Sequence, residues 1–328
     1  MGQPSRDRWE RVGRVAAYGA ALALTPYLLI KVSWVIGALL GLVPLSSEFD
    51  MAGWVVLNVA TIGMAATGIV TALALVRPWG MRTPGAAVAF CTWVGTGFLV
   101  PLLPFMILGS LLGPEGGGEA GGGEEQSGGG GDDGAAMPVW EGWLIEFGFV
   151  GMGLCLALAL PVYLRRRWPD AFAGRVGERE GGTPSGPPWV VFVGAALGAV
   201  WLYWAVGGTA GVAQPAARYT NWHLLTGTAG VCALASAAAV WALTRARPAG
   251  LPRWIPMALG WLGSGSLFAW SGWKLPYTLV LAAVRPDDVT LPENLGVAAA
   301  LHIAAVVAGA AMLRALVRPL RQGALAVP

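Results

Sequence analysis

The chain has little charge for its length. Only 12% of its 328 residues are Asp, Glu, Lys or Arg, and 55% are hydrophobic, whereas roughly 25% of the residues of a typical soluble domain are charged. A soluble chain this apolar would expose more hydrophobic surface than water tolerates. The deficit excludes an ordinary soluble fold, and it favours an all-α integral membrane protein whose first partner is the lipid bilayer.

Cysteine pairs and the common catalytic motifs are missing as well. The three cysteines, Cys91, Cys155 and Cys232, lie in separate apolar segments without CxxC spacing, so we interpret them as small buried residues. The sequence contains no H-E-x-x-H, P-loop or paired-aspartate motif. We therefore predict no metal site and no nucleic-acid partner, and we favour a non-catalytic role over a membrane-embedded enzyme.

Hydrophobic segments long enough to cross a bilayer are, by contrast, abundant. A spanning helix needs about 20 mostly apolar residues, and tryptophan, which prefers the membrane interface, marks many of the segment ends. We predict eight spanning helices: Ala16–Val43, Ala52–Val76, Gly85–Gly113, Trp140–Leu164, Trp189–Ala213, Trp222–Leu243, Trp254–Val284 and Leu295–Leu313.

The basic residues lie almost entirely on one side of these predicted spans. Of the 21 Lys and Arg residues, seventeen fall in the N-terminus, in alternate loops and in the tail, whereas the loops of the other side hold only Arg218 and Arg285. Cytoplasmic loops carry the excess of Lys and Arg. We therefore predict a multi-pass protein of the cell membrane with both termini in the cytoplasm.

The loops predict a division into two halves. The long outer loop is acidic and Gly-rich, so it cannot bury a core and we expect it to be disordered. The predicted organisation is a basic cytoplasmic N-terminus (1–15), a first four-helix unit (16–164) that contains the outer loop (114–138), a cytoplasmic linker (165–188), a second four-helix unit (189–313) and a cytoplasmic tail (314–328).

Similar landmarks recur in the two halves. The segment Lys31-Val-Ser-Trp-Val-Ile-Gly37 aligns with Trp201-Leu-Tyr-Trp-Ala-Val-Gly207, and Leu103-Pro-Phe105 aligns with Leu275-Pro-Tyr277. These matches predict an internal repeat. Because each predicted repeat has an even number of spans, the two would insert the same way up, related by an axis along the membrane normal.

One of these landmarks also resembles a known pattern. The segment Tyr203-Trp-Ala-Val-Gly-Gly208, followed by Pro215, resembles a Tyr-Trp-Ala-x-Gly-Gly signature of small, uncharacterised four-helix bacterial membrane proteins. The resemblance covers one helix, and the first half has only the weaker Ser33-Trp-Val-Ile-Gly37. It implies a duplicated four-helix unit and carries no activity over.

Ionisable side chains inside the predicted spans define the candidate site, because such groups are costly in lipid and mark function by default. At about 1.5 Å per helical residue, Lys31, Glu146 and Lys274 are predicted to lie at similar heights in the outer half of the membrane. We predict an outward-half polar pocket, for transport or binding of a small or lipid-like anionic ligand, formed by Lys31, Lys274 and Glu146 with His302, Tyr27 and Tyr277 nearby. The alternative is one buried ion pair and one lysine that snorkels to the surface.

Two further hypotheses compete with ligand binding. His223 and His302 could hold a haem in a redox protein, but their estimated heights differ by about 15 Å, whereas two ligands of one iron need nearly equal heights. We therefore predict no cofactor, with haem as the lesser alternative. The other hypothesis is a structural or assembly partner of a membrane complex, for which the sequence names no protein partner.

Overall fold

The structure is a computed structural model that describes residues 3–42, 51–112, 139–178, 188–284 and 291–324. These residues form α-helices, one short 3-10 helix (η1, Pro215–Ala217) and two isolated β-bridges, and they contain no β-strand. The prediction of an all-helical chain is confirmed. The predicted disorder of the outer loop, residues 114–138, lies outside the described residues.

The helices group into two compact units, each described by itself. Unit 1 consists of Met1–Thr92 and Ser110–Tyr163, and unit 2 consists of Trp93–Gly109 and Leu164–Pro328. The predicted first half, residues 16–164, therefore contributes a segment in the middle of its sequence to unit 2.

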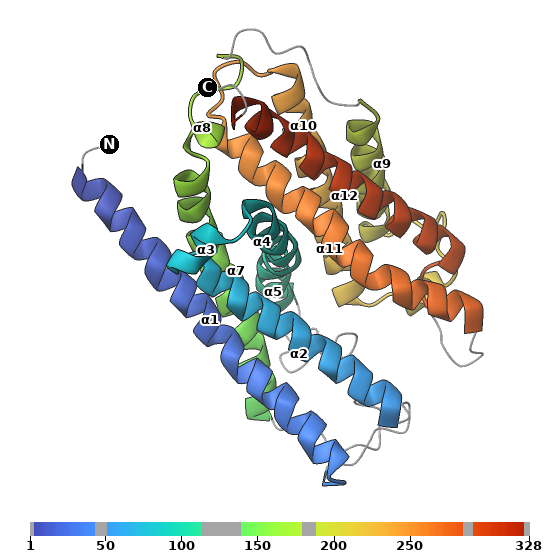
Figure 1. Ribbon diagram of the computed structural model, residues 1–328. Coiled ribbons are helices and arrows are strands. Elements are labelled where there is room, and N and C mark those ends of the chain that lie inside the picture. Colours follow the sequence, from blue (N-terminus) through green and yellow to red (C-terminus); the bar gives the residue numbers. More distant parts are fainter. Residues whose placement is uncertain (1–2, 43–50, 113–138, 179–187, 285–290, 325–328) are drawn as a thin grey trace. The chain divides into compact units, whose positions relative to one another are not determined.

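Unit 1 is built around helix α1 (Gln3–Leu39), which runs beside α2 (Met51–Ala74) in Figure 1. Helix α7 (Val139–Arg167) packs closely on α1, since a Cβ atom on Gly148 would lie 3.0 Å from the carbonyl oxygen of Ala23. The short helix α3 (Pro78–Arg82) follows α2. The basic N-terminal segment that the sequence places before the first span is part of α1, which is 37 residues long.

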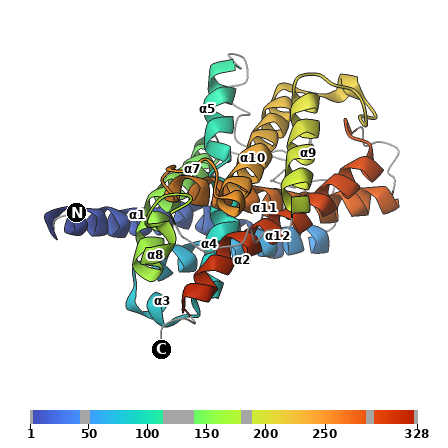
Figure 2. The same cartoon turned by 90° about the horizontal axis from the view of Figure 1, so that it is seen from above.

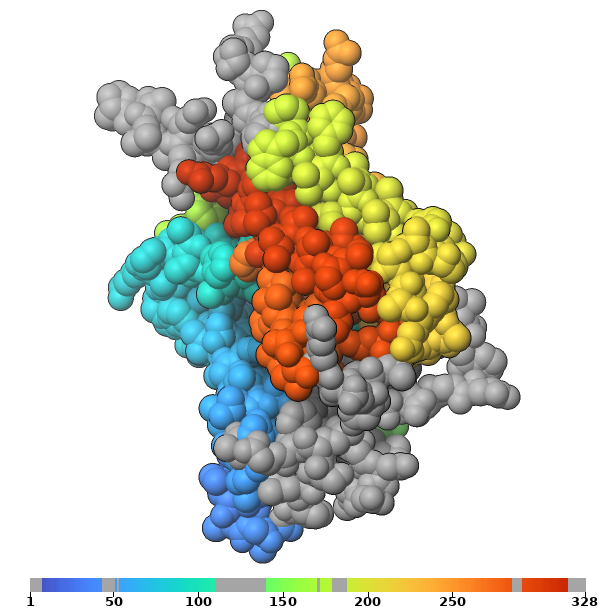
Figure 3. Space-filling view, turned by 90° about the vertical axis from the view of Figure 1, so that its right-hand side faces the viewer, coloured from blue at the N-terminus to red at the C-terminus, as the bar shows by residue number. Residues whose placement is uncertain are grey.

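Unit 2 contains four long helices that pack in chain order, and the last also contacts the first. They are α9 (Pro188–Ala205), α10 (Thr220–Arg245), α11 (Trp254–Val284) and α12 (Leu295–Ala324). Figure 2 shows α9 beside α10, and Figure 3 shows a face on which α11 (orange) adjoins α12 (red). The core consists of aliphatic, methionine and tryptophan side chains, among them Val190, Leu197, Trp201, Trp204, Trp222, Met257, Leu267 and Met312.

The segment Trp93–Gly109 of unit 2 lies in a broken helix. Helix α4 (Gly85–Leu99) ends one turn before α5 (Leu102–Leu112) begins, and the break falls at Val100–Pro101. Proline has no N–H to donate and its ring clashes with the preceding turn. Pro101 and Pro104 lie within one turn of each other, and the two prolines together account for the break at this point.

The end of α4 crosses α11 at two glycines. A Cβ atom on Gly265 would lie 3.1 Å from the Cα atom of Gly97, so the two backbones touch. Around this contact the hydrogen bonds are reciprocal: Trp93 Nε1 donates to Ser264 Oγ at 3.0 Å, and Trp261 Nε1 donates to Thr96 Oγ1 at 3.2 Å. Both helices therefore use the same pattern, Trp-x-Gly-[Ser/Thr]-Gly, to bind each other.

Seven helical segments among the described residues are long and apolar enough to cross a membrane, and they correspond to seven of the eight predicted spans. They are Arg8–Leu39, Gly53–Ala74, Gly85–Gly109, Trp140–Arg167, Pro188–Ala205, Thr220–Arg245 and Leu295–Val317. This is the composition of a multi-pass membrane protein. The remaining predicted span is α11, which is 31 residues long but rich in Gly, Ser and Trp, so it is less apolar than the others.

Two predicted boundaries differ from the structure. The fifth span was expected to reach Ala213, but α9 ends at Ala205, because Gly207 adopts a left-handed backbone with φ +104° that stops the helix. Part of the expected linker, residues 165–188, is ordered against unit 2: Val176 N donates to Leu251 O at 2.8 Å, and Gly250 N donates back to Val176 O at 3.0 Å.

Candidate functional site

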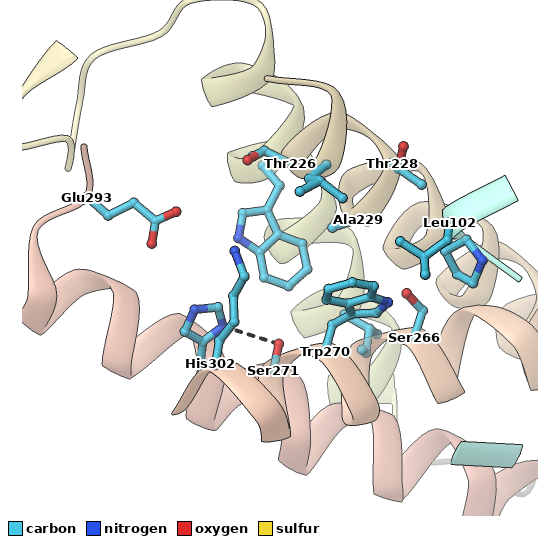
Figure 4. A pocket seen from close by; sticks show the side chains of 14 residues that line it. Leu102, Thr226, Thr228, Ala229, Ser266, Trp270, Ser271, Glu293 and His302 are labelled. Carbon is cyan, nitrogen blue, oxygen red and sulfur yellow. Dashed lines mark hydrogen bonds between the residues drawn. The ribbon is translucent and has the colours of Figure 1, made fainter. Parts of the chain in front are cut away.

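Unit 2 contains a pocket that reaches every one of its long helices. Figure 4 shows Glu293 at the end opposite Leu102 and Ser266, with Ser271 and His302 along the wall made by α11 and α12. The lining is apolar at Pro101, Leu102, Trp201, Leu225, Ala229, Leu267 and Trp270, and it is polar or charged at Thr226, Thr228, Ser266, Ser271, Lys274, Glu293 and His302.

Glu293 is positioned by the loop that follows α9. Ala213 N and Gln214 N both donate to Pro292 O, and Asn294 N donates to Gly211 O. The side chain of Asn294 then accepts hydrogen bonds from the first free N–H groups of α12, as an N-cap does. The carboxylate of Glu293 accepts a hydrogen bond from Trp222 Nε1 at 3.1 Å. The acid is thus fixed just before the N-terminus of α12.

The tryptophan that binds Glu293 belongs to a polar network at the same end of unit 2. The guanidinium of Arg218 donates to Gly208 O at 2.8 Å and to Trp204 O at 3.3 Å, so it binds carbonyl groups just where α9 ends. It also lies 5.5 Å from the centre of the Trp222 ring. Arg218 therefore stabilises the loop that holds the acid.

Lys274 and His302 face the same pocket from α11 and α12. His302 is 7% exposed, and its Nδ1 lies 3.3 Å from the buried hydroxyl of Ser271. Lys274 is half-buried. Within the described part of the chain no Asp or Glu lies within ion-pair distance of its ammonium, although Glu293 lines the same pocket. The pocket thus offers one cation, one imidazole and several hydroxyl groups.

Trp270 connects the pocket to the break between α4 and α5. Its ring stacks on Phe98 with the ring centres 4.4 Å apart and the planes 4° from parallel. Its Nε1 donates to Phe98 O at 3.1 Å. In an unbroken α-helix, the N–H of Leu102 would donate a hydrogen bond to this carbonyl of Phe98, four residues earlier. The indole replaces that bond, and the same side chain lines the pocket.

The pocket is small. It encloses about 60 Å³ of free volume, which accommodates a few water molecules or one small polar group rather than a large ligand. Its hydroxyl, imidazole and ammonium groups can all donate hydrogen bonds. The lining is therefore suited to the charged group of a ligand.

Unit 1 holds a second polar cluster, around Lys31. The ammonium is 4% exposed and donates to Asn58 Oδ1 at 3.1 Å. It also lies 4.1 Å from the centre of the Trp34 ring and 5.8 Å from that of Tyr27, within the range of cation–π attraction. Asn58 in turn donates to the carbonyl oxygen of Trp54 at 2.9 Å.

The acid of this cluster is Glu141, which the sequence analysis did not select. Its carboxylate is 8% exposed and accepts a hydrogen bond from Trp34 Nε1 at 2.7 Å. Glu141 lies in the first turn of α7, where a carboxylate is also favoured by the helix dipole. A signal was present in the sequence: the last span of each predicted half begins with a glutamate shortly after a proline, Glu141 after Pro138 and Glu293 after Pro292.

The predicted site residues are thus distributed over two clusters. Lys31 and Tyr27 lie together in unit 1, where the Tyr27 ring also packs 4.9 Å from Phe149. Lys274 and His302 lie together in unit 2. Glu146 is half-buried on α7 of unit 1, and Tyr277 is 60% exposed on α11, so its ring lies on the surface of unit 2. That all three charged residues form one site stays a prediction.

The two histidines are each engaged by a protein oxygen. His223 Nδ1 lies 2.9 Å from Ala205 O at the end of α9, and the ring of Trp222 meets it edge to face. Among the residues that the structure describes, no group of three or more His, Cys, Asp and Glu side chains is placed to hold a metal ion. The absence of a haem cofactor stays a prediction. The absorption spectrum of the purified protein tests it, because bound haem would give a Soret band.

Comparison of the chain with models of protein families, with curated proteins and with solved structures found no match in any of the three.

Proposed function

We propose that this protein is an eight-span membrane protein in which the pocket of unit 2 takes up the anionic group of a small or lipid-like ligand, for transport or for binding. The observation that carries the proposal is Lys274, a lysine within a long helix that faces a pocket and has no acid at ion-pair distance among the described residues. A charge in a membrane helix is costly unless a partner compensates it.

The surroundings of Lys274 favour an anion as that partner. Ser271, His302 and Thr226 are buried side chains that line the pocket and can donate hydrogen bonds. Hydrogen bonds between an ammonium and an anionic oxygen are about twice as strong as those between neutral groups. A phosphate or carboxylate beside Lys274 would therefore be bound by one charge and several dipoles.

The proposal takes α11 as the eighth span. A helix that faces lipid must be apolar, but α11 packs against α10 and α12 and buries its Gly and Ser residues, such as Gly263 and Ser264. Its lower hydropathy is consistent with an interior position in a bundle, where small residues allow close packing. With α11 counted, the arginines alternate as the sequence analysis requires, and both termini are cytoplasmic.

The same orientation places the pocket toward the outer leaflet. Lys274 is 21 residues after Arg253, or about 31 Å along the helix from the predicted inner edge. The reciprocal contacts of Trp93 and Trp261 support the proposed duplication, because two copies of one helix meet through equivalent residues. The resemblance to small four-helix bacterial membrane proteins is part of this proposal.

Binding of an anionic lipid by the purified chain tests the proposed function. The probe is phosphatidylglycerol, added to the full-length protein in neutral detergent and measured by native mass spectrometry. We expect Lys274→Met to lower the bound fraction strongly and Lys274→Arg, which keeps the charge, to retain it. Arg82→Met removes an exposed positive charge outside the pocket and serves as the matched control.

Equal lipid retention by the wild type, Lys274→Met and Arg82→Met would contradict the proposal. The thermal unfolding midpoint of each variant, measured in the same detergent, separates lost binding from lost folding. Lys274→Met is expected to unfold within a few degrees of the wild type, because the residue is half-buried and replaced by a side chain of similar length.

A further inference from the structure

The pocket of unit 2 contains an acid as well as a cation. Glu293 and Lys274 both line it, from the segment before α12 and from α11. The carboxylate is engaged by Trp222, an N–H donor, and no ion pair joins it to Lys274. Two opposite charges therefore share a small cavity without neutralising each other directly.

A purely anionic ligand would satisfy only half of this arrangement. It would compensate Lys274, but it would bring a second negative charge toward Glu293 in a medium that screens charges poorly. A purely cationic ligand would meet the opposite problem at Lys274. A ligand with both charges compensates each of them, and charges removed from water are costly without a partner.

The aromatic walls of the pocket support the cationic end of such a ligand. Trp201 and Trp270 both line it, and indole faces attract ammonium groups within about 6 Å of the ring centre. The free volume of about 60 Å³ limits the bound part to a compact group. An ammonium a few bonds away from a phosphate or carboxylate has this size and charge distribution.

Resting on the function proposed above, we propose that the ligand group is a zwitterion, with its phosphate or carboxylate at Lys274 and His302 and its ammonium at Glu293. The chemistry is shared by two sources, a free amino-phosphate or amino acid and the headgroup of an aminophospholipid. The proposal goes beyond anion binding because it assigns Glu293 the role of selecting ligands that carry an ammonium group.

A comparison of matched probes tests this assignment on the full-length protein in neutral detergent. The soluble probes are phosphoethanolamine and inorganic phosphate, measured by calorimetry. The lipid probes are phosphatidylethanolamine and phosphatidylglycerol, measured by native mass spectrometry. We expect the wild type to bind the zwitterion of at least one pair about tenfold more tightly than its anionic counterpart, the gain expected of one charge-assisted hydrogen bond.

Two variants locate the preference. Glu293→Gln keeps an oxygen that can accept from Trp222, and we expect it to bind the two members of a pair with similar affinity. Glu293→Asp keeps the charge and is expected to retain part of the preference for the zwitterion. Lys274→Met is expected to weaken the binding of both members. The thermal unfolding midpoint confirms that each variant is folded.

The outcomes separate the two proposals. Tighter binding of the anion than of the zwitterion, or a preference that survives Glu293→Gln in folded protein, overturns the zwitterion proposal and leaves anion binding intact. Failure of the wild type to bind any of the four probes overturns both. Binding of only the soluble or only the lipid zwitterion supports the proposal and identifies the source of the ligand.

Discussion

The two units use similar parts with different results. Each places a glutamate near the N-terminus of its last helix, and each binds that carboxylate with a tryptophan N–H: Trp34 to Glu141 at 2.7 Å in unit 1, and Trp222 to Glu293 at 3.1 Å in unit 2. Each also has one lysine in its helices. The lysine of unit 1 is enclosed by partners, whereas the lysine of unit 2 faces a cavity.

The difference lies in the surroundings of the two lysines. Lys31 is 4% exposed, bonded to Asn58 and covered by the Trp34 ring, so its charge is compensated within unit 1. Lys274, by contrast, lines a pocket. A charge in a membrane helix thus indicates a ligand site only where the protein leaves its compensation incomplete. Unit 1 thus contains a buried polar cluster around Lys31, whereas Lys274 of unit 2 lines a pocket.

The largest expected effect is the loss of stability when the glutamate of each unit is replaced by leucine. Glu141→Leu leaves the buried ammonium of Lys31 without its nearby carboxylate and Trp34 without an acceptor, so we expect a loss of about 3 kcal/mol or more of stability. Glu293→Leu removes one hydrogen bond at a half-buried position and is expected to cost about 1 kcal/mol. Unfolding by increasing fractions of SDS in mixed micelles measures both, and equal losses would show that the two acids have the same role.

A smaller effect concerns the helix crossing that holds the broken helix in unit 2. A Cβ atom on Gly265 would lie 2.6 Å from Trp93 O, so Gly265→Ala must push the two backbones apart and is expected to cost about 1 to 3 kcal/mol. Gly272→Ala on the same helix is the matched control. Its nearest neighbour would lie 4.0 Å away, so we expect it to be neutral or stabilising. The same SDS unfolding assay decides, and a neutral Gly265→Ala would refute the close crossing.

The smallest effect tests the link between the pocket and the helix break. Trp270→Phe keeps an aromatic ring that can stack on Phe98, but it removes the N–H that donates to the carbonyl oxygen of Phe98. We expect this to lower the stability by about 1 kcal/mol. We expect faster hydrogen exchange of the amides just after the break, at Leu102 and Leu103. Trp241→Phe, at a position 44% exposed on α10, should leave these amides unchanged. Unaltered exchange in Trp270→Phe would mean that the indole does not support the break.

Much of the fold was predictable, because the length and the apolar composition of a segment are enough to identify a helix that can span a bilayer. Seven predicted spans have a counterpart among the described helices, including Gly85–Gly109, whose break follows from Pro101 and Pro104. The division into units was not predictable in the same way. Trp93–Gly109 belongs to unit 2 because of its contact with α11, and the pattern Trp-x-Gly-[Ser/Thr]-Gly is informative only once both copies are compared.

The candidate site was predictable in part. Lys31, Lys274 and His302 could be selected from sequence because they are ionisable residues inside predicted spans, and counting residues from the arginines gave each a predicted height. Height carries no information about lateral neighbours, and this is why Glu146 was chosen as the partner rather than Glu141, about 7.5 Å away along the same helix. Glu141 and Glu293 escaped notice because each lies at a helix end, where a charge costs little.

The most direct test of the account compares Lys31→Met with Lys274→Met in one experiment. Binding of phosphatidylglycerol and phosphatidylethanolamine is measured by native mass spectrometry, and the thermal unfolding midpoint is measured on the same samples. The account predicts that Lys274→Met loses the lipid but unfolds near the wild-type temperature, whereas Lys31→Met unfolds at a clearly lower temperature while its folded fraction retains the lipid. Loss of the lipid in Lys31→Met with full retention in Lys274→Met would contradict it.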